Sequence, residues 1–488
     1  MMLSRRFPCL PPALSLLALA ALSFAPRVAG TAEPEPAGDI NMPNAANATV
    51  AFTGTTPDEL SAPGAAEVTI DWQKTGRRVE PFIYSMNVFN IVRPSMLAQP
   101  AWHEGIRYMA PRLLRLHNAE IGNAWFDAKT GRWDYAKIRT ILDAAGTQPA
   151  GTVLMLNING WPDVYDTDKD YRLDVDRVGD YARLCADLVR FINIELKTGV
   201  RYWEVTNERD VPYWRQLPPG RQPDVAALAT IYNQAAVAMR AVDPTIKIGG
   251  PAACYPLPAK PLQEFVRLTR DNLDFFSFHS YASGVTSESD QTIYEKVAII
   301  AKNTADLARW LKDIAPDRAI ELHLNEYNVN YTWHTNEVRM INHKSAVFDA
   351  LSLIAFAQVP GLTAANAWND MDRVYGKMDA TGALRPAAHV YHYFNTYLQG
   401  TIASSLSSAD KAVVPFAIAD GNGGRPAFAL VNRTNGPQTV TLNFAGTPKT
   451  GTWTTASIDA DGLHTDAPVS LQTPLALPPH SVHIYWSN

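Results

Sequence analysis

Eight short apolar or aromatic runs, separated by longer amphipathic stretches, restrict the fold of this chain more than any other feature. They occur at 82–88, 112–117, 152–158, 201–207, 245–249, 274–280, 319–325 and 363–368. Between these runs, apolar residues recur at helical spacing, for example at 134–145, 176–197, 223–241 and 291–314. A strand followed by a helix, repeated eight times, predicts a closed (β/α)8 TIM barrel, and a doubly wound sheet is the alternative.

The chain after the barrel has a different pattern. A last helix is predicted at 386–399, and short alternating runs follow at 413–418, 426–432, 438–444 and 482–486. Such runs, separated by turn residues, predict a C-terminal antiparallel β-sandwich domain, which a strand at 67–72 could complete. We expect five parts: a signal peptide at 1–32, a flexible leader at 33–66, an N-terminal strand at 67–80, the catalytic barrel at 81–399 and the β-sandwich at 400–488.

The N-terminus predicts export. Arg5 and Arg6 precede an apolar run at 13–25, and small residues follow, which is typical of a signal peptide. We therefore expect a secreted or periplasmic protein. Removing the peptide takes away three arginines and no acidic residue, so the formal net charge goes from -5 to -8. A negative charge disfavours nucleic acid as a partner, and no later run predicts a membrane helix. Oligomeric state cannot be predicted.

Two cysteines, Cys185 and Cys254, remain after the signal peptide. So few cysteines in so long a chain do not form a disulfide scaffold. We interpret them as small buried residues, with a single disulfide as the alternative.

Two of the predicted strands end in Asn-Glu, at Glu208 and at Glu326. Catalytic groups of a barrel lie at the carboxyl ends of its strands. Cleavage of a glycosidic bond requires two carboxyls there, one to protonate the leaving oxygen and one to attack or stabilise the sugar. Solvated loop residues are the alternative interpretation of either glutamate. Glu204 lies deeper in its strand and is predicted to pair with Arg115 or Arg201 inside the barrel.

Three motifs carry a family resemblance: Tyr-Trp-Glu-Val-Thr-Asn-Glu at 202–208, Asp-Phe-Phe-Ser-Phe-His-Ser-Tyr at 274–281 and Leu-Asn-Glu-Tyr-Asn at 324–328. With them the chain resembles clan A of the glycoside hydrolases, and most of all family 39, the group of β-xylosidases and α-L-iduronidases. Family 51 arabinofuranosidases are the near alternative. The chain departs from the family 39 pattern at Arg209-Asp210, where proline is common, and at Tyr327, where tryptophan is frequent.

The resemblance implies a retaining glycoside hydrolase with Glu208 as general acid/base and Glu326 as nucleophile. It also implies that Asn207 binds the sugar 2-hydroxyl and that Arg115 keeps Glu326 ionised. Six further residues are predicted to contact substrate: His117, Asn159, Trp161, His279, Tyr281 and Trp368. No metal and no cofactor is expected, and a carbohydrate is the expected partner.

Two other classes compete with this interpretation. A metal-dependent hydrolase is disfavoured because the first strand ends without a His-x-His pair, although Asp370 and Asp372 follow the eighth strand. A non-catalytic carbohydrate-binding barrel would need neither glutamate. Within the hydrolase class, the family resemblance implies a β-xyloside substrate and leaves open an arabinofuranoside, a uronide or a bacterial exopolysaccharide cut internally.

Overall fold

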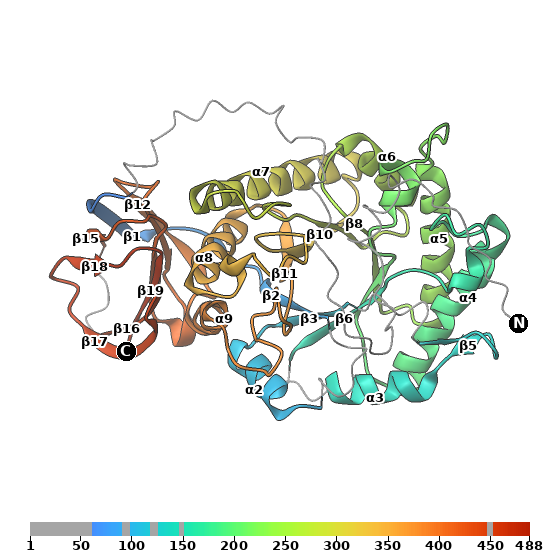
Figure 1. Cartoon of the computed structure of the whole chain (residues 1–488), viewed down its shortest axis with the longest axis horizontal. Helices are drawn as coiled ribbons and strands as arrows, with labels where there is room; N and C mark the ends of the chain where they lie inside the picture. Colours follow the sequence, from blue (N-terminus) through green and yellow to red (C-terminus); the bar gives the residue numbers. More distant parts are fainter. Residues whose placement is uncertain (1–60, 90–97, 118–124, 146–150, 447–451) are drawn as a thin grey trace, which may run out of the picture.

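A computed structural model describes residues 61–89, 98–117, 125–145, 151–446 and 452–488. The predicted signal peptide and most of the predicted leader lie outside these residues. Eight parallel strands close into a barrel in the order β10-β11-β2-β3-β6-β7-β8-β9 (Figure 1). Their bounds are β2 (Phe82–Val88), β3 (Leu113–Leu116), β6 (Val153–Ile158), β7 (Tyr202–Val205), β8 (Lys247–Ala253), β9 (Phe275–His279), β10 (Glu321–Tyr327) and β11 (Leu362–Ala367). The TIM barrel is confirmed, and the doubly wound alternative is wrong because the sheet closes.

Helices cover the outside of the barrel: α2 (Pro100–Met109), α3 (Tyr135–Ala145), α4 (Val178–Val189), α5 (Val225–Val242), α6 (Ala259–Thr269), α7 (Asp290–Ile314), α8 (His343–Gln358) and α9 (Pro386–Tyr397). α7 shows why these segments are helical. Ser289 caps its N-terminus by accepting a hydrogen bond from the Thr292 amide, and its buried residues recur at helical spacing. Among the described helices, α5 is long and apolar enough to cross a membrane, but it packs against α4, α6 and the barrel.

Layers of side chains fill the barrel interior, as is usual for this fold. An apolar layer lies near the amino ends of the strands, formed by Leu113, Met155, Tyr202 and Phe275. Asn325 connects it to a polar layer above, because its amide group lies 3.6 Å from the Met155 sulfur. The polar layer contains buried charges and amides and supports the carboxyl ends of the strands, where a site is expected.

The C-terminal domain is one nine-stranded sheet in the order β17-β16-β19-β14-β13-β12-β1-β15-β18. Its strands are β1 (Gly64–Arg78), β12 (Thr401–Ser407), β13 (Val413–Ile418), β14 (Ala427–Asn432), β15 (Gln438–Ala445), β16 (Trp453–Asp459), β17 (Gly462–Val469), β18 (Leu475–Leu477) and β19 (Ser481–Ser487). β1 begins inside the segment predicted as a leader, and it pairs antiparallel with β12 and parallel with β15.

The sheet folds back on itself, which makes it sandwich-like. Trp72 on β1 stacks on Trp453 of β16 with ring centroids 6.2 Å apart, although four strands separate β1 from β16 in the sheet order. Phe428 on β14 contacts both rings from the middle of the sheet. These contacts bring β1 and β16 together around a second hydrophobic core.

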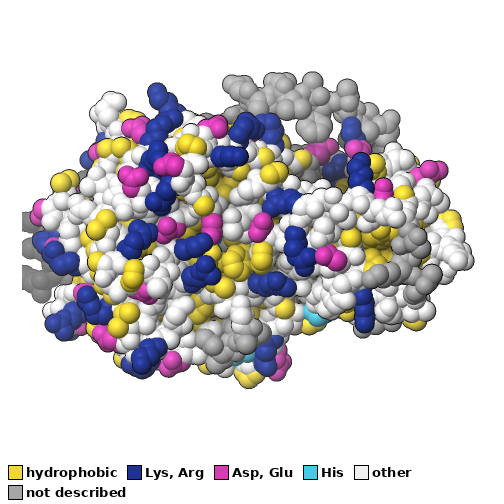
Figure 2. Space-filling model, turned by 180° about the vertical axis from the view of Figure 1, so that it is seen from behind, with side chains coloured by type: hydrophobic (Ala, Val, Ile, Leu, Met, Phe, Trp, Pro, Cys, Tyr) yellow, Lys and Arg dark blue, Asp and Glu magenta, His cyan; other side chains and the backbone are white. Residues whose placement is uncertain are grey.

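The outer face of this sheet packs against α8 and α9, so the domain lies beside the barrel (Figure 1). Trp486 on β19 stacks on Tyr397 at the end of α9, with centroids 4.3 Å apart. On the opposite view of the molecule, Lys and Arg side chains are interspersed with Asp and Glu (Figure 2). That face therefore presents charges of both signs.

Glu321, at the amino end of β10, is expected to stabilise the fold in a pH-dependent way. Burial alone would raise its pKa, but His323 and Lys247 contact the carboxylate and lower the pKa to about 2. A lowered folded-state pKa gives stability that is present above the unfolded value of 4.5 and is lost as the pH falls toward 2. We expect Glu321→Gln to lower the free energy of unfolding by roughly 2 kcal/mol at pH 7.

Urea unfolding measured at pH 7 and pH 3 tests this expectation. The difference between variant and wild type should shrink at pH 3. Glu264→Gln, at an exposed position of α6, is the control and should leave the stability unchanged at both values. An equal loss for Glu321→Gln at both pH values would contradict the assignment.

Candidate active site

Arg115, on β3, organises the polar layer below the barrel mouth. Its side chain is fully buried and pairs with two glutamates, Glu204 at 2.6 Å and Glu326 at 3.1 Å. It also donates hydrogen bonds to the side-chain oxygens of Asn87 and Asn207, each at 2.8 Å. The guanidinium thus holds the carboxylate of Glu326 and the side chain of Asn207, which precedes Glu208.

Glu204, on β7, pairs with Arg115, one of the two partners that the sequence left open. Its carboxylate accepts hydrogen bonds from Asn157 at 2.7 Å and from Asn325 at 2.5 Å. Burial alone would raise its pKa, but Arg115 keeps the pKa of Glu204 below its usual range. Glu204 therefore stays charged, and its hydrogen-bond capacity is used inside the barrel.

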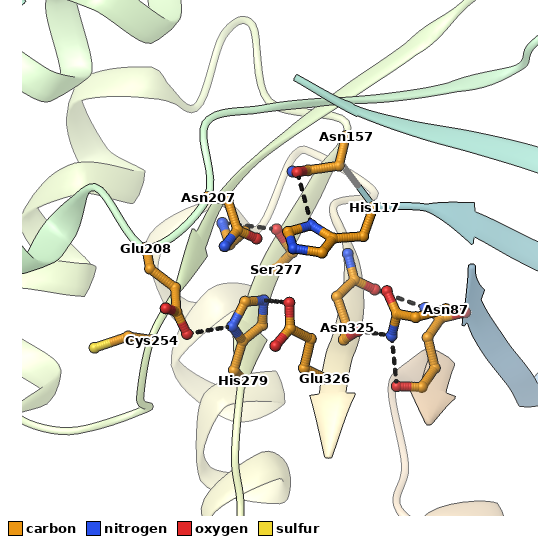
Figure 3. A network of polar contacts seen from close by, with 12 residues as sticks. Asn87, His117, Asn157, Asn207, Glu208, Cys254, Ser277, His279, Asn325 and Glu326 are labelled. Carbon is orange, nitrogen blue, oxygen red and sulfur yellow. Dashed lines mark hydrogen bonds and ion pairs between the residues drawn. The ribbon is translucent and has the colours of Figure 1, made fainter. Parts of the chain in front are cut away.

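Glu208 and Glu326 lie on either side of the His279 imidazole (Figure 3). The Nδ1 atom of His279 is 2.8 Å from Glu208 Oε1, and its Nε2 atom is 3.4 Å from Glu326 Oε1. Oxygen atoms of the two carboxylates lie within 4.8 Å of one another and of a histidine nitrogen. Tyr281 donates a hydrogen bond of 2.8 Å to the other oxygen of Glu326. The structure thus brings together four residues that the sequence marked as site residues.

A bulge in β10 turns Glu326 into the barrel. Alternation along β10 would place neighbouring residues on opposite faces, yet Asn325 contacts Glu204 and Glu326 contacts Arg115. The register with β9 shifts between Leu324 and Glu326, which brings Glu326 opposite His279. A bulge re-aims a side chain in this way, and here it directs two successive polar residues inward.

Glu208 is placed by an irregular turn instead of a strand. β7 ends at Val205, and Thr206 and Glu208 both have positive φ, at 70° and 52°. Non-glycine residues rarely adopt this left-handed region and do so mostly where surrounding contacts hold them. Two backbone bonds hold the turn: the amide of Asn207 donates to Asn159 and the amide of Glu208 donates to Ala252, both at 2.9 Å.

The surroundings of the two carboxyls differ. Burial raises the pKa of Glu208 to about 8, and the nearby Asp210 adds to the rise. Burial also raises the pKa of Glu326, but His279, Arg115 and the Tyr281 hydroxyl oppose that rise. Burial lowers the pKa of His279, so its imidazole is neutral at pH 7. Of the two carboxyls, Glu208 is the one that carries a proton near neutral pH.

Aromatic rings form one wall beside these residues. Trp368, which follows β11, contacts the His117 ring at 4.8 Å and Phe89 at 4.9 Å. Phe89 also contacts Trp333, which lies against Tyr375. Phe89, Trp333 and Tyr375 were not predicted, because they lie in loops whose geometry the sequence pattern does not specify.

The remaining predicted residues differ in their surroundings. Asn207 accepts from Arg115 through its side-chain oxygen, and its NH2 group has no hydrogen bond to any residue that the structure describes. His117 is buried and its Nδ1 lies 3.1 Å from the Asn157 side-chain oxygen. Asn159 supports the Asn207 backbone. Trp161 is buried, with Arg209 stacked over its ring at 4.7 Å, which indicates packing between loops more than an open platform for sugar.

The carboxylates after β11 are engaged in structural bonds. Asp370 accepts from the Trp102 indole at 2.7 Å and from the Phe89 amide at 3.1 Å. Asp372 accepts from three successive backbone amides, those of residues 374–376. All four carboxylate oxygens thus accept at least one hydrogen bond from the protein.

Glu208, His279 and Glu326 are close enough to offer three ligand atoms to a metal ion. However, the two imidazole nitrogens face different carboxylates, and Arg115 already pairs with Glu326. The cluster is therefore better suited to moving a proton than to holding a divalent cation.

A comparison with protein families identifies the class of enzyme. Residues 188–384 match the model of the glycosyl hydrolases family 39, and this segment contains both β7 and β10 with the two carboxylates. The chain is a glycoside hydrolase, and over this segment it is similar to family 39 of clan A. Within that clan, this glycoside hydrolase resembles family 39 most, as its motifs predict. No curated protein matches its sequence.

Solved structures show the same fold for this glycoside hydrolase. A GH39 β-xylosidase from Caulobacter crescentus superposes with a TM-score of 0.62 at 17% identity, covering 86% of this chain and 99% of its own. A GH51 arabinofuranosidase from Xanthomonas axonopodis pv. citri gives 0.65 at 14% identity, covering 87% of this chain and 100% of its own. The GH39 enzyme of the same organism gives 0.63 at 15% identity, covering 89% and 100%. At these identities the likeness is one of fold.

Proposed function

We propose that this enzyme is a retaining glycoside hydrolase that acts by double displacement, with Glu208 as general acid/base and Glu326 as nucleophile. One observation carries the proposal: carboxylate oxygens of the two residues lie within 4.8 Å of one another. Retaining enzymes separate their carboxyls by about 5 to 5.5 Å, whereas inverting enzymes need about 6.5 to 9.5 Å to admit a water molecule.

In the first step Glu326 attacks the anomeric carbon and the bond to the leaving oxygen breaks. Glu208 gives its proton to that oxygen, so the leaving group departs as an alcohol. The neutral His279 can accept a hydrogen bond from protonated Glu208 at Nδ1, which leaves its Nε2 proton facing Glu326. This arrangement favours one proton on Glu208 and a negative charge on Glu326.

In the second step water hydrolyses the glycosyl ester on Glu326. The ester carries no charge, so the negative charge within 4.8 Å that disfavours ionisation of Glu208 is removed. Its pKa then falls, and Glu208 takes a proton from the attacking water. Release of Glu326 as a carboxylate, held by Arg115 and Tyr281, restores the starting state.

The proposed subsite for the reacting sugar lies between the carboxylates and the aromatic wall. The NH2 group of Asn207 would donate to the sugar 2-hydroxyl, a contact that strengthens in the transition state. Trp368 and His117 would face the sugar ring from the wall.

β-Xylosides are the substrate class that we favour, because the family 39 match covers both carboxylates. α-L-Arabinofuranosides are second, because an arabinofuranosidase shares the fold. The predicted signal peptide supports action outside the cytoplasm on plant or bacterial saccharides.

Hydrolysis of aryl glycosides followed by proton NMR tests the proposal. The panel contains a β-xyloside, an α-L-arabinofuranoside, a β-glucoside, a β-galactoside and a uronide. We expect turnover of one pentoside, with the first-formed sugar in the anomeric configuration of the substrate. An inverted first product would contradict double displacement, and saccharide binding without hydrolysis of any glycoside or polysaccharide would favour a binding protein.

A further inference from the structure

We propose that Asp210 is a positioning residue that holds the turn of the acid/base and keeps Glu208 protonated at neutral pH. The proposal rests on the role of Glu208 proposed above. Asp210 follows Glu208 by two residues, and its side chain is fully buried. No step of the double displacement uses it directly.

The contacts of Asp210 connect two loops at the barrel mouth. One of its oxygens pairs with Arg215, and the other accepts a hydrogen bond of 3.1 Å from the Cys254 amide. Arg215 in turn donates to the backbone oxygens of Tyr255 and Leu257. The Asp210–Arg215 pair therefore ties the loop after β7 to the segment after β8.

The Asp210–Arg215 pair lies next to two backbone segments with unfavourable conformations. Glu208 and Ala252 both have positive φ, at 52° and 50°, and the Glu208 amide donates to the Ala252 oxygen at 2.9 Å. Two non-glycine residues in the left-handed region, bonded to each other, persist when neighbouring contacts fix both segments. Asp210 supplies such contacts on both sides, through Cys254 and through Arg215.

Charge is the second part of the inference. Glu208 faces His279 on β9, Glu326 on β10, Arg115 on β3 and the Asp210–Arg215 pair on its own loop. Cys254 faces it from the segment after β8, and burial raises the pKa of that thiol, so it is neutral. After burial, the negative charge of Asp210 contributes most to the raised pKa of Glu208, while Arg115 and Arg215 oppose it.

Direct titration of Glu208 tests the inference without a substrate. The protein is labelled with 13C at glutamate side-chain carboxyls, and the Glu208 signal is identified by its loss in Glu208→Gln. In Asp210→Asn we expect the pKa of Glu208 to fall by roughly 1 unit, since a nearby negative charge is removed. In Arg215→Gln we expect a rise, because a positive charge is removed while Asp210 stays.

Asp274→Asn is the matched control. Asp274 precedes β9 at the opposite end of the barrel, accepts a hydrogen bond of 2.9 Å from the Ile248 amide and pairs with Arg240 at 2.5 Å. It has the same kinds of contact as Asp210, so its loss should affect stability alone and leave the titration of Glu208 unchanged.

Kinetics separates failure of this inference from failure of the proposed function. On a substrate that wild type hydrolyses, Asp210→Asn should move the alkaline limb of kcat/KM to lower pH, and Asp210→Glu should restore its position. Unchanged titrations of Glu208 in both Asp210→Asn and Arg215→Gln would overturn the inference, even if hydrolysis is retaining. Opposite shifts in the two variants support it even if Asp210→Asn is less stable than wild type.

Discussion

Glu326→Ala is expected to lower kcat by about 10⁴-fold or more on every glycoside that wild type hydrolyses. The change removes the group that attacks the anomeric carbon, so no covalent intermediate can form. KM should change far less, because Asn207 and the aromatic wall are retained. Steady-state kinetics on the best substrate of the panel gives both constants.

The fold of this variant should survive, since Arg115 keeps its buried partner Glu204. Glu321→Gln is the matched control, because Glu321 lies on the same strand at the opposite end of the barrel. It should retain kcat despite its lower stability. Turnover by Glu326→Ala within tenfold of wild type would show that another group is the nucleophile.

Glu208→Gln is expected to lower kcat by roughly 10³-fold on substrates with poor leaving groups. Protonation of the leaving oxygen is lost, whereas the attack by Glu326 is not. An aryl glycoside whose phenol leaves without a proton should therefore still transfer its sugar to Glu326 at a nearly normal rate. Comparing a nitrophenyl glycoside with the corresponding disaccharide in single-turnover experiments measures the difference.

The pH profile of wild type provides a second test of the same residue. Burial raises the pKa of Glu208 to about 8, and the protonated form is the active acid. Activity should therefore hold through neutral pH and fall as the pH rises through about 8. Glu208→Gln should lack this alkaline limb. If the activity of Glu208→Gln still falls as the pH rises through about 8, another residue is the acid.

Much of the barrel could be predicted because its pattern is local. Each apolar run corresponds to one barrel strand, since strands that are buried on both faces need continuous apolar residues. The two glutamates were found because catalytic groups follow strand ends. An ion pair of Glu204 inside the barrel was predicted from its depth in the strand, but the choice of Arg115 over Arg201 was not.

Features that depend on long-range packing were not predictable from the sequence. The bulge that turns Glu326 inward is a departure from alternation, and no local pattern marks it. The amides of Asn87, Asn157 and Asn325 form a buried polar layer whose partners come from different strands. Asparagines at inward positions of three strands, β2, β6 and β10, were the available signal. The folding of the C-terminal sheet onto itself depends likewise on Trp72 and Trp453, which are far apart in the sequence.

The most direct test of double displacement is to trap the glycosyl enzyme. A 2-deoxy-2-fluoro glycoside with a good leaving group slows both steps, since fluorine destabilises the positive charge at the anomeric carbon, and the second step is slowed more. Mass spectrometry of the intact protein and of its peptides then locates the label. The account predicts one fluoroglycosyl group per chain, attached to Glu326. A label on a different residue, or hydrolysis with inversion and no label, would contradict it.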